Sequence, residues 1–125
     1  YGAQIGSSGD GAQIGSSGDG AQIGSSGYDA RIGSSGDGAQ IGSSGDGAQI
    51  GSSGDGARIN AEGAHAVVVC AGLGAKVRAG QSGAVALTWH DGERSRIAVG
   101  YVGENLQANT WYRLDDKGAF VEAEE

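Results

Sequence analysis

The repeat that decides the fold reads Gly-Ala-Gln-Ile-Gly-Ser-Ser-Gly-Asp and stands unbroken at residues 2–10, 11–19, 38–46 and 47–55. Residues 20–28 differ only in ending with Tyr28, and residues 29–37 begin with Asp-Ala-Arg. A short fixed period is typical of solenoids, in which each unit packs against its neighbours instead of folding alone. The isoleucines keep the nine-residue step throughout: Ile5, Ile14, Ile23, Ile32, Ile41, Ile50 and Ile59.

Each unit favours a short strand followed by a corner. Every glycine in a helix costs ~1 kcal/mol relative to alanine, and one large apolar residue per unit makes no helical stripe. Ala-Gln-Ile alternates as a strand does, with Ala and Ile on one face and Gln on the other. Asp-Gly and Ser-Ser-Gly are typical of turns. We therefore predict an all-β protein.

A coil of nine residues is too small to enclose side chains, so we expect about two units per coil, with three units as the alternative. Two units give a flattened roll of two sheets in which isoleucine faces isoleucine. Coils then stack ~4.8 Å apart, and identical residues form ladders of Ile, Ala, Ser and Gln.

The nine-residue phase outlasts the Gly-Ser filler. Ala57-Arg58-Ile59 is followed at the same step by residues 66–68, 75–77 and 84–86. We predict a nonapeptide-repeat β-solenoid over residues 1–86 and a C-terminal β capping module over residues 87–125.

The capping module is expected to consist of two hairpins. Residues 87–89 and 96–102 flank one turn, and residues 110–114 and 119–122 flank another. A stack of strands leaves an open edge, which a hairpin module laid over the last coil would block. Its aromatic residues are predicted to pack the cap: Trp89, Trp111, Tyr112 and Phe120.

The N-terminal end has no such module, because Tyr1-Gly2-Ala3 enters directly into the repeat. We therefore expect a homo-oligomer joined through an open N-terminal coil. The absence of an initiator Met and the start in mid-repeat indicate a processed or truncated chain.

The chain resembles bacterial and prophage-encoded β-solenoid proteins of uncharacterised function. The resemblance lies in the nonapeptides, in residues 83–89 (Gly-Ala-Val-Ala-Leu-Thr-Trp), in residues 96–100 and in residues 108–114. It implies a fold and a source but no activity or catalytic residue. The regularity is also compatible with an engineered origin.

The recurring aspartates are the candidates for a metal site, because stacking would place like charges roughly 5 Å apart unless a cation or turn N–H groups relieve them. Calcium-binding nonapeptides need Gly-Gly-x-Gly-x-Asp, whereas here Gly9 and Asp10 are adjacent, so we favour a corner role. The candidates are Asp10, Asp19, Asp37, Asp46 and Asp55.

The sequence gives little support for an ice-binding surface or a catalytic site. The Ser-Ser pairs could form an ice-binding hydroxyl array, but such arrays usually present Thr; a corner role is the alternative. A serine nucleophile needs a base, and His65 and His90 lie on different elements without a nucleophile-elbow pattern. We expect no enzyme activity, no metal and no cofactor.

The net charge of −7 disfavours nucleic acid and anionic membranes as direct partners. The lone Cys70 is expected to be a small buried hydrophobe, and a single thiol fits a reducing, cytoplasmic compartment. The sequence shows neither a signal peptide nor an apolar run near the ~18 residues that a transmembrane helix needs.

These observations favour a non-enzymatic structural or interaction protein, a rigid scaffold with one capped and one open end. The alternative is a binding module, either an acidic DNA mimic or an ice- or cation-binding solenoid.

Overall fold

The computed structural model describes residues 4–123, which form thirteen strands and no helix. Tyr1 to Ala3, where the repeat is predicted to begin, lie outside these residues. The strands are β1 (Gln4–Ser7), β2 (Gln13–Ser16), β3 (Gln22–Ser25), β4 (Arg31–Ser34), β5 (Gln40–Ser43), β6 (Gln49–Ser52), β7 (Arg58–Ala61), β8 (Val67–Cys70), β9 (Lys76–Ala79), β10 (Ala84–His90), β11 (Ser95–Tyr101), β12 (Trp111–Leu114) and β13 (Phe120–Glu122).

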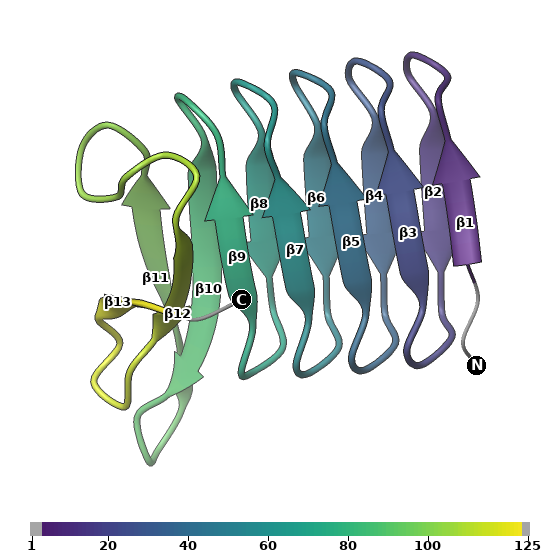
Figure 1. Cartoon of the computed structure of the whole chain (residues 1–125). Helices are drawn as coiled ribbons and strands as arrows, with labels where there is room; N and C mark the ends of the chain where they lie inside the picture. The colour runs from purple at the N-terminus through teal and green to yellow at the C-terminus, as the bar shows by residue number, and fades with distance from the viewer. Residues whose placement is uncertain (1–3, 124–125) are drawn as a thin grey trace.

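The described strands form two sheets that face each other, and successive strands from β1 to β10 alternate between them (Figure 1). Sheet A has the order β1-β3-β5-β7-β9-β12-β13, and sheet B has the order β11-β10-β8-β6-β4-β2. The chain is thus an all-β solenoid of about five coils.

The register places residues 18 apart beside each other along each sheet. Ile5 pairs with Ile23 and Ile23 with Ile41, while Ile14 pairs with Ile32 on the opposite sheet. Strands in a sheet lie ~4.8 Å apart, so each ladder repeats a side chain at that spacing.

Isoleucine and alanine fill the space between the sheets. Ile23, Ile32, Ile41 and Ile50 are each 3% exposed and Ile59 is fully buried, whereas Ile5 and Ile14 at the N-terminal end are only partly buried. Stacking makes this narrow interior dry, because each coil covers the apolar side chains of the next.

The first serine of each Ser-Ser pair faces the interior, where a corner position had been expected. Ser25, Ser34, Ser43 and Ser52 end their strands and are buried, and their hydroxyls have no hydrogen-bond partner among the described residues. Alternation explains the placement, because each lies two residues after an inward isoleucine. Later coils put Ala61 and Cys70 at the same register position.

The glycine that follows each Ser-Ser pair lets adjacent coils touch through their backbones. A Cβ at Gly45 would lie 1.9 Å from the carbonyl oxygen of Gly27, and one at Gly54 would lie equally close to that of Gly36. No side chain fits at this position.

The residue that follows each corner position, which Asp occupies in most units, adopts a positive φ. Glycine occupies this place in most units, for example Gly38 at 69°, while Asp29 (56°) and His65 (61°) occupy it in two others. Asp29 therefore holds a left-handed conformation that glycine adopts without strain.

The predicted phase is wrong by one residue at the last coil. Ala84 pairs with Val67 and Val85 with Val68, an offset of 17 residues, so Val85 takes the inward place that the repeat assigned to Ala86. The connection between β9 and β10 is one residue shorter, with Ser82 at a φ of 59°. This shortening places residues 84–86 on the faces opposite to those that the nine-residue frame predicts.

The C-terminal hairpins extend the two sheets beyond the last coil by pairing with its two strands. β11 pairs antiparallel with β10 in sheet B, and β12 pairs antiparallel with both β9 and β13 in sheet A (Figure 1). The connection between β11 and β12 places Leu106, 4% exposed, in the interior.

Candidate functional site

Each aspartate considered as a metal ligand forms hydrogen bonds with the backbone of the next coil, through its carboxylate and through the N–H group that follows it. Asp37 Oδ1 accepts a hydrogen bond from the Asp55 N–H at 2.9 Å, and the Gly38 N–H donates to the Asp55 carbonyl at 2.8 Å. Asp10, Asp19, Asp46 and Asp55 accept in the same way from the residue 18 places on. Backbone N–H donors thus stabilise these carboxylates at the corners.

The register also separates these aspartates into two groups. Residues 18 apart share an edge, so Asp19, Asp37 and Asp55 stack on one edge, while Tyr28 separates Asp10 from Asp46 on the other. Across residues 4–123 no group of three or more His, Cys, Asp or Glu side chains is placed to hold a metal ion. Their hydrogen bonds to the next coil show that these carboxylates hold neighbouring corners together.

Two other aspartates order the turns of the C-terminal hairpins. Hydrogen bonds from the Arg94 N–H, the Arg96 side chain and the Glu93 N–H hold the pKa of Asp91 well below its ordinary value. The N–H groups of Ala119 and Lys117 likewise lower the pKa of Asp115. Both turns therefore depend on ionised carboxylates.

Acid should weaken the turns of these two hairpins. A carboxyl whose pKa falls on folding stabilises the folded state fully above its unfolded pKa, about 4, and loses that contribution as pH falls further. We expect tryptophan fluorescence to report a change below about pH 4, because Trp89 packs on Gly118 in the second turn. The double variant Asp91→Asn/Asp115→Asn should lack this acid transition; an unchanged transition would contradict the assignment.

Cys70 lies in the interior on β8, 1% exposed. Burial raises the pKa of its thiol to about 12. The thiol is therefore protonated at neutral pH and occupies a position that Ser52 and Ala61 fill in preceding coils.

The four predicted cap aromatics separate into two environments. Tyr112 and Phe120 pack on the interior cluster, with their rings 6.3 Å apart and edge to face, and the Tyr112 hydroxyl accepts a hydrogen bond from the Gln107 N–H at 2.8 Å. Trp111 is half-buried on the outer face of sheet A, where the Arg58 guanidinium lies 5.2 Å from its ring centroid. Trp89 is also half-buried.

Cationic side chains gather beside Trp111 on this outer face. Arg58 pairs with Lys76 across β7 and β9, Asn60 with Arg78, and Arg78 with Trp111 across β9 and β12. Three of the eight Lys and Arg residues of an acidic chain thus share one patch. We call Arg58, Asn60, Lys76, Arg78 and Trp111 the basic patch.

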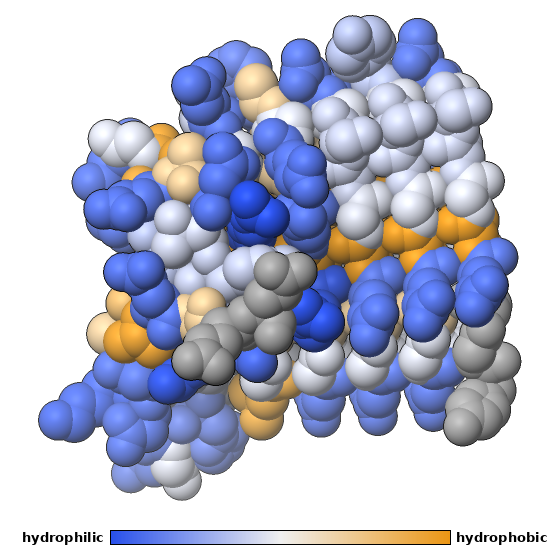
Figure 2. Space-filling model, in the orientation of Figure 1, coloured by the Kyte–Doolittle hydropathy of each residue, from blue (hydrophilic) through white to orange (hydrophobic). Residues whose placement is uncertain are grey.

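A groove runs along sheet A into the basic patch. The residues Gly6 and Gly42 leave its floor without side chains, and Gln4, Gln22 and Gln40 form one wall in line with Arg58. Figure 2 looks onto this face and shows a hydrophilic row beside an apolar stripe. We did not expect these cations to lie together, because the sequence expectations did not assign residues to one sheet or the other.

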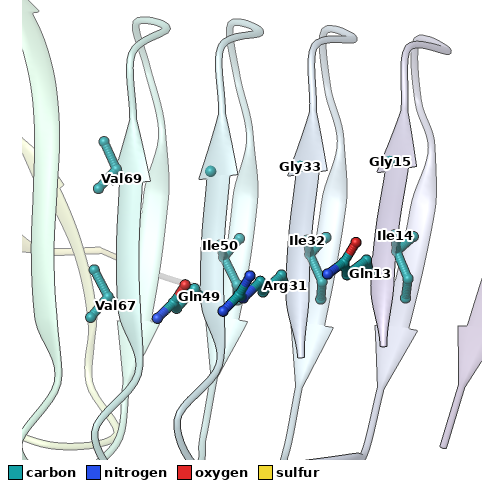
Figure 3. Close-up of a pocket in the computed structure, with 11 residues that line it drawn as sticks. Gln13, Ile14, Gly15, Arg31, Ile32, Gly33, Gln49, Ile50, Val67 and Val69 are labelled. Carbon is teal, nitrogen blue, oxygen red and sulfur yellow. The ribbon is translucent and has the colours of Figure 1, made fainter. Parts of the chain in front are cut away.

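Sheet B carries a corresponding groove that ends differently. Gln13, Arg31 and Gln49 line one side in a single row, and Val67 and Val69 close its C-terminal end (Figure 3). Beyond them the outer face continues as an apolar surface on β10 and β11, with Ile97, Val99 and Tyr101 exposed. Only one of the two grooves therefore leads to a group of cations.

The N-terminal end exposes two strand edges. Within the described residues β1 pairs only with β3, and β2 only with β4. Each edge thus presents one row of backbone N–H and C=O groups that belongs to no ladder in the described part of the chain, an arrangement that can accept a further strand.

Part of the chain is similar to an uncharacterised bacterial protein. A segment of 44 residues, 34% of this chain, is 50% identical to YdhT, an uncharacterised protein of Escherichia coli (strain K12), and covers 16% of that protein's length. No family model matches the chain, and no solved structure matches it. In residues 4–123 no helix is long and apolar enough to cross a membrane.

Proposed function

We propose that this chain is a non-catalytic structural and interaction module, a rigid β-solenoid closed at its C-terminal end and joined to a second copy through its N-terminal coil. The observation that carries the proposal is the difference between the ends. β1 and β2 leave regular parallel edges, whereas the last coil is followed by antiparallel hairpins.

Rigidity follows from how the coils hold one another. Each interior isoleucine is covered by the coil on either side. At each corner that carries Asp, the carboxylate and the following N–H group both form hydrogen bonds with the backbone of the next coil. Such a repeat tolerates changes in the number of units, because each unit contacts only its neighbours. A spacer or scaffold needs no further chemistry.

Closure of the C-terminal end is supported by Leu106, Tyr112 and Phe120, which fill the interior beyond the last coil. The Asn109 N–H donates to the Ala79 carbonyl at 2.8 Å and fastens the connection between β11 and β12 to β9. β13 is a short edge strand of three residues, and short edges resist pairing with other chains. The partial match to an uncharacterised protein of E. coli is compatible with a structural role.

Analytical ultracentrifugation over a range of concentrations tests the self-association. We expect the unmodified chain to form a dimer whose fraction rises with concentration. Ile5→Lys places a charge inside the exposed N-terminal coil and should give a monomer with an unchanged circular dichroism spectrum. Gln4→Lys changes the outward neighbour on the same strand and should leave the dimer intact.

A chain that stays monomeric at every concentration would refute the proposal. Equal effects of Ile5→Lys and Gln4→Lys would refute the assignment of the interface to the N-terminal coil, because only one of the two side chains faces the interior.

A further inference from the structure

Within the basic patch Arg58 lies over the Trp111 ring, and the Asn60 amide donates a hydrogen bond to Glu62 Oε1 at 2.9 Å. Among residues 4–123 no carboxylate forms a salt bridge with Arg58, Lys76 or Arg78. The described chain has eight buried polar side-chain atoms without a hydrogen-bond partner, and four of them belong to the basic patch: Arg58 Nε, Asn60 Oδ1, Arg78 Nε and Trp111 Nε1. Three of these four atoms are N–H donors and the fourth is an amide oxygen, and the described residues offer none of them a partner.

The chemistry of the patch favours a carboxylate as the acceptor. Guanidinium groups match planar oxyanions through paired N–H donors, and such charge-assisted hydrogen bonds are about twice as strong as neutral ones. The Trp111 ring holds Arg58 by a cation–π contact at 5.2 Å, which restricts the guanidinium to the groove. Phosphate-rich nucleic acid fits poorly, because only three cations face it on a chain of net charge −7.

The groove indicates a linear ligand. From Arg58 it continues along Gln40, Gln22 and Gln4, one amide per strand at ~4.8 Å spacing, over a floor of glycines. A peptide strand would need free backbone groups, but those of the floor already belong to the parallel ladders. A chain of sugars presents hydroxyl groups at each unit, and amide side chains both donate to and accept from hydroxyls.

We propose that the outer face of sheet A binds an acidic polysaccharide, with a uronic-acid carboxylate at Arg58 and Arg78 and the following sugars along the glutamine row. This site does not depend on self-association, because it lies on a sheet face and the proposed interface lies at β1 and β2.

The chain offers a matched pair of variants. Arg58→Gln continues the ladder of Gln22 and Gln40 in sheet A, so the fold already accommodates glutamine there. Arg31→Gln makes the same substitution between Gln13 and Gln49 in sheet B and removes the same charge from the opposite groove. Both variants should keep the circular dichroism spectrum of the unmodified chain.

Isothermal titration calorimetry with a short oligogalacturonate tests the proposal. We expect saturable binding that weakens by about tenfold or more in Arg58→Gln and Arg78→Gln and is unchanged in Arg31→Gln. A neutral cello-oligosaccharide of equal length should bind much more weakly.

Three results would overturn the proposal: no binding of the oligogalacturonate, equal weakening by Arg58→Gln and Arg31→Gln, or binding of poly-glutamate as tight as that of the sugar. The last result would assign the patch to an acidic peptide. None of the three bears on the ultracentrifugation result, so the two proposals fail separately.

Discussion

Gly45→Ala should destabilise the solenoid by about 3 kcal/mol or more, whereas Gly42→Ala, three residues earlier, should stabilise it slightly. A Cβ at Gly45 would lie 1.9 Å from the Gly27 carbonyl oxygen and 2.6 Å from its carbon, so neighbouring coils would have to separate. A Cβ at Gly42 has no atom within 4 Å and points outward, where the next strand carries Asn60.

Urea unfolding followed by circular dichroism measures both variants. The expected gain for Gly42→Ala is about 0.5 kcal/mol, since alanine restricts the unfolded chain more than glycine does. The two residues belong to the same unit and undergo the same substitution, so they differ only in their surroundings. Similar unfolding midpoints for the two variants would contradict the close approach of the coils.

Ile41→Ala should cost about 3 kcal/mol, and Ile5→Ala about 1 kcal/mol. Ile41 is 3% exposed between the coils that carry Ile23 and Ile59, whereas Ile5 is partly buried and pairs with one described isoleucine. Removing a side chain from the middle leaves a cavity that the neighbouring coils cannot fill. Removing it at the end exposes the site to water.

Thermal unfolding by calorimetry distinguishes the two positions. If the coils stack, Ile41→Ala must lower the free energy of unfolding more than Ile5→Ala does. Equal costs at Ile41 and Ile5 would mean that the coils do not cover one another, and a negligible cost at Ile41 would mean that the isoleucines do not form the interior.

The periodic part of the chain could be interpreted from sequence because one rule repeats. Alternation in Ala-Gln-Ile indicates which side chains face inward, and the same rule extended to Ser25 or Ser43 would have placed the first serine inside. We assigned these serines to a corner instead, because Ser-Ser-Gly is typical of turns. The backbone contact at Gly45 could not be predicted from the sequence, because it involves a residue 18 positions away.

The last coil was harder to predict because the shortened connection leaves no clear mark in the sequence. Ala84-Val85-Ala86 fits the predicted frame and the shifted frame equally well, since all three residues are small and apolar. The hairpins could be found from their turns, but which sheet each would join depends on that shift.

The basic patch could have been recognised from the sequence once the 18-residue coil was applied to it. Arg58 and Lys76 are 18 residues apart, as are Asn60 and Arg78, so both pairs share one face. Considered without the sheets, the same arginines are interleaved with acids. Trp111 could not have been added, because it comes from an antiparallel strand outside the repeat.

The pairing of strands 18 residues apart is tested most directly by pyrene labels on outward side chains, in a Cys70→Ala background. Gln22→Cys with Gln40→Cys places two labels on neighbouring strands of sheet A and should give strong excimer emission. Gln22→Cys with Arg31→Cys places them on opposite sheets and should give monomer emission only. Excimer emission from the second pair, or its absence from the first, would contradict the two-sheet coil.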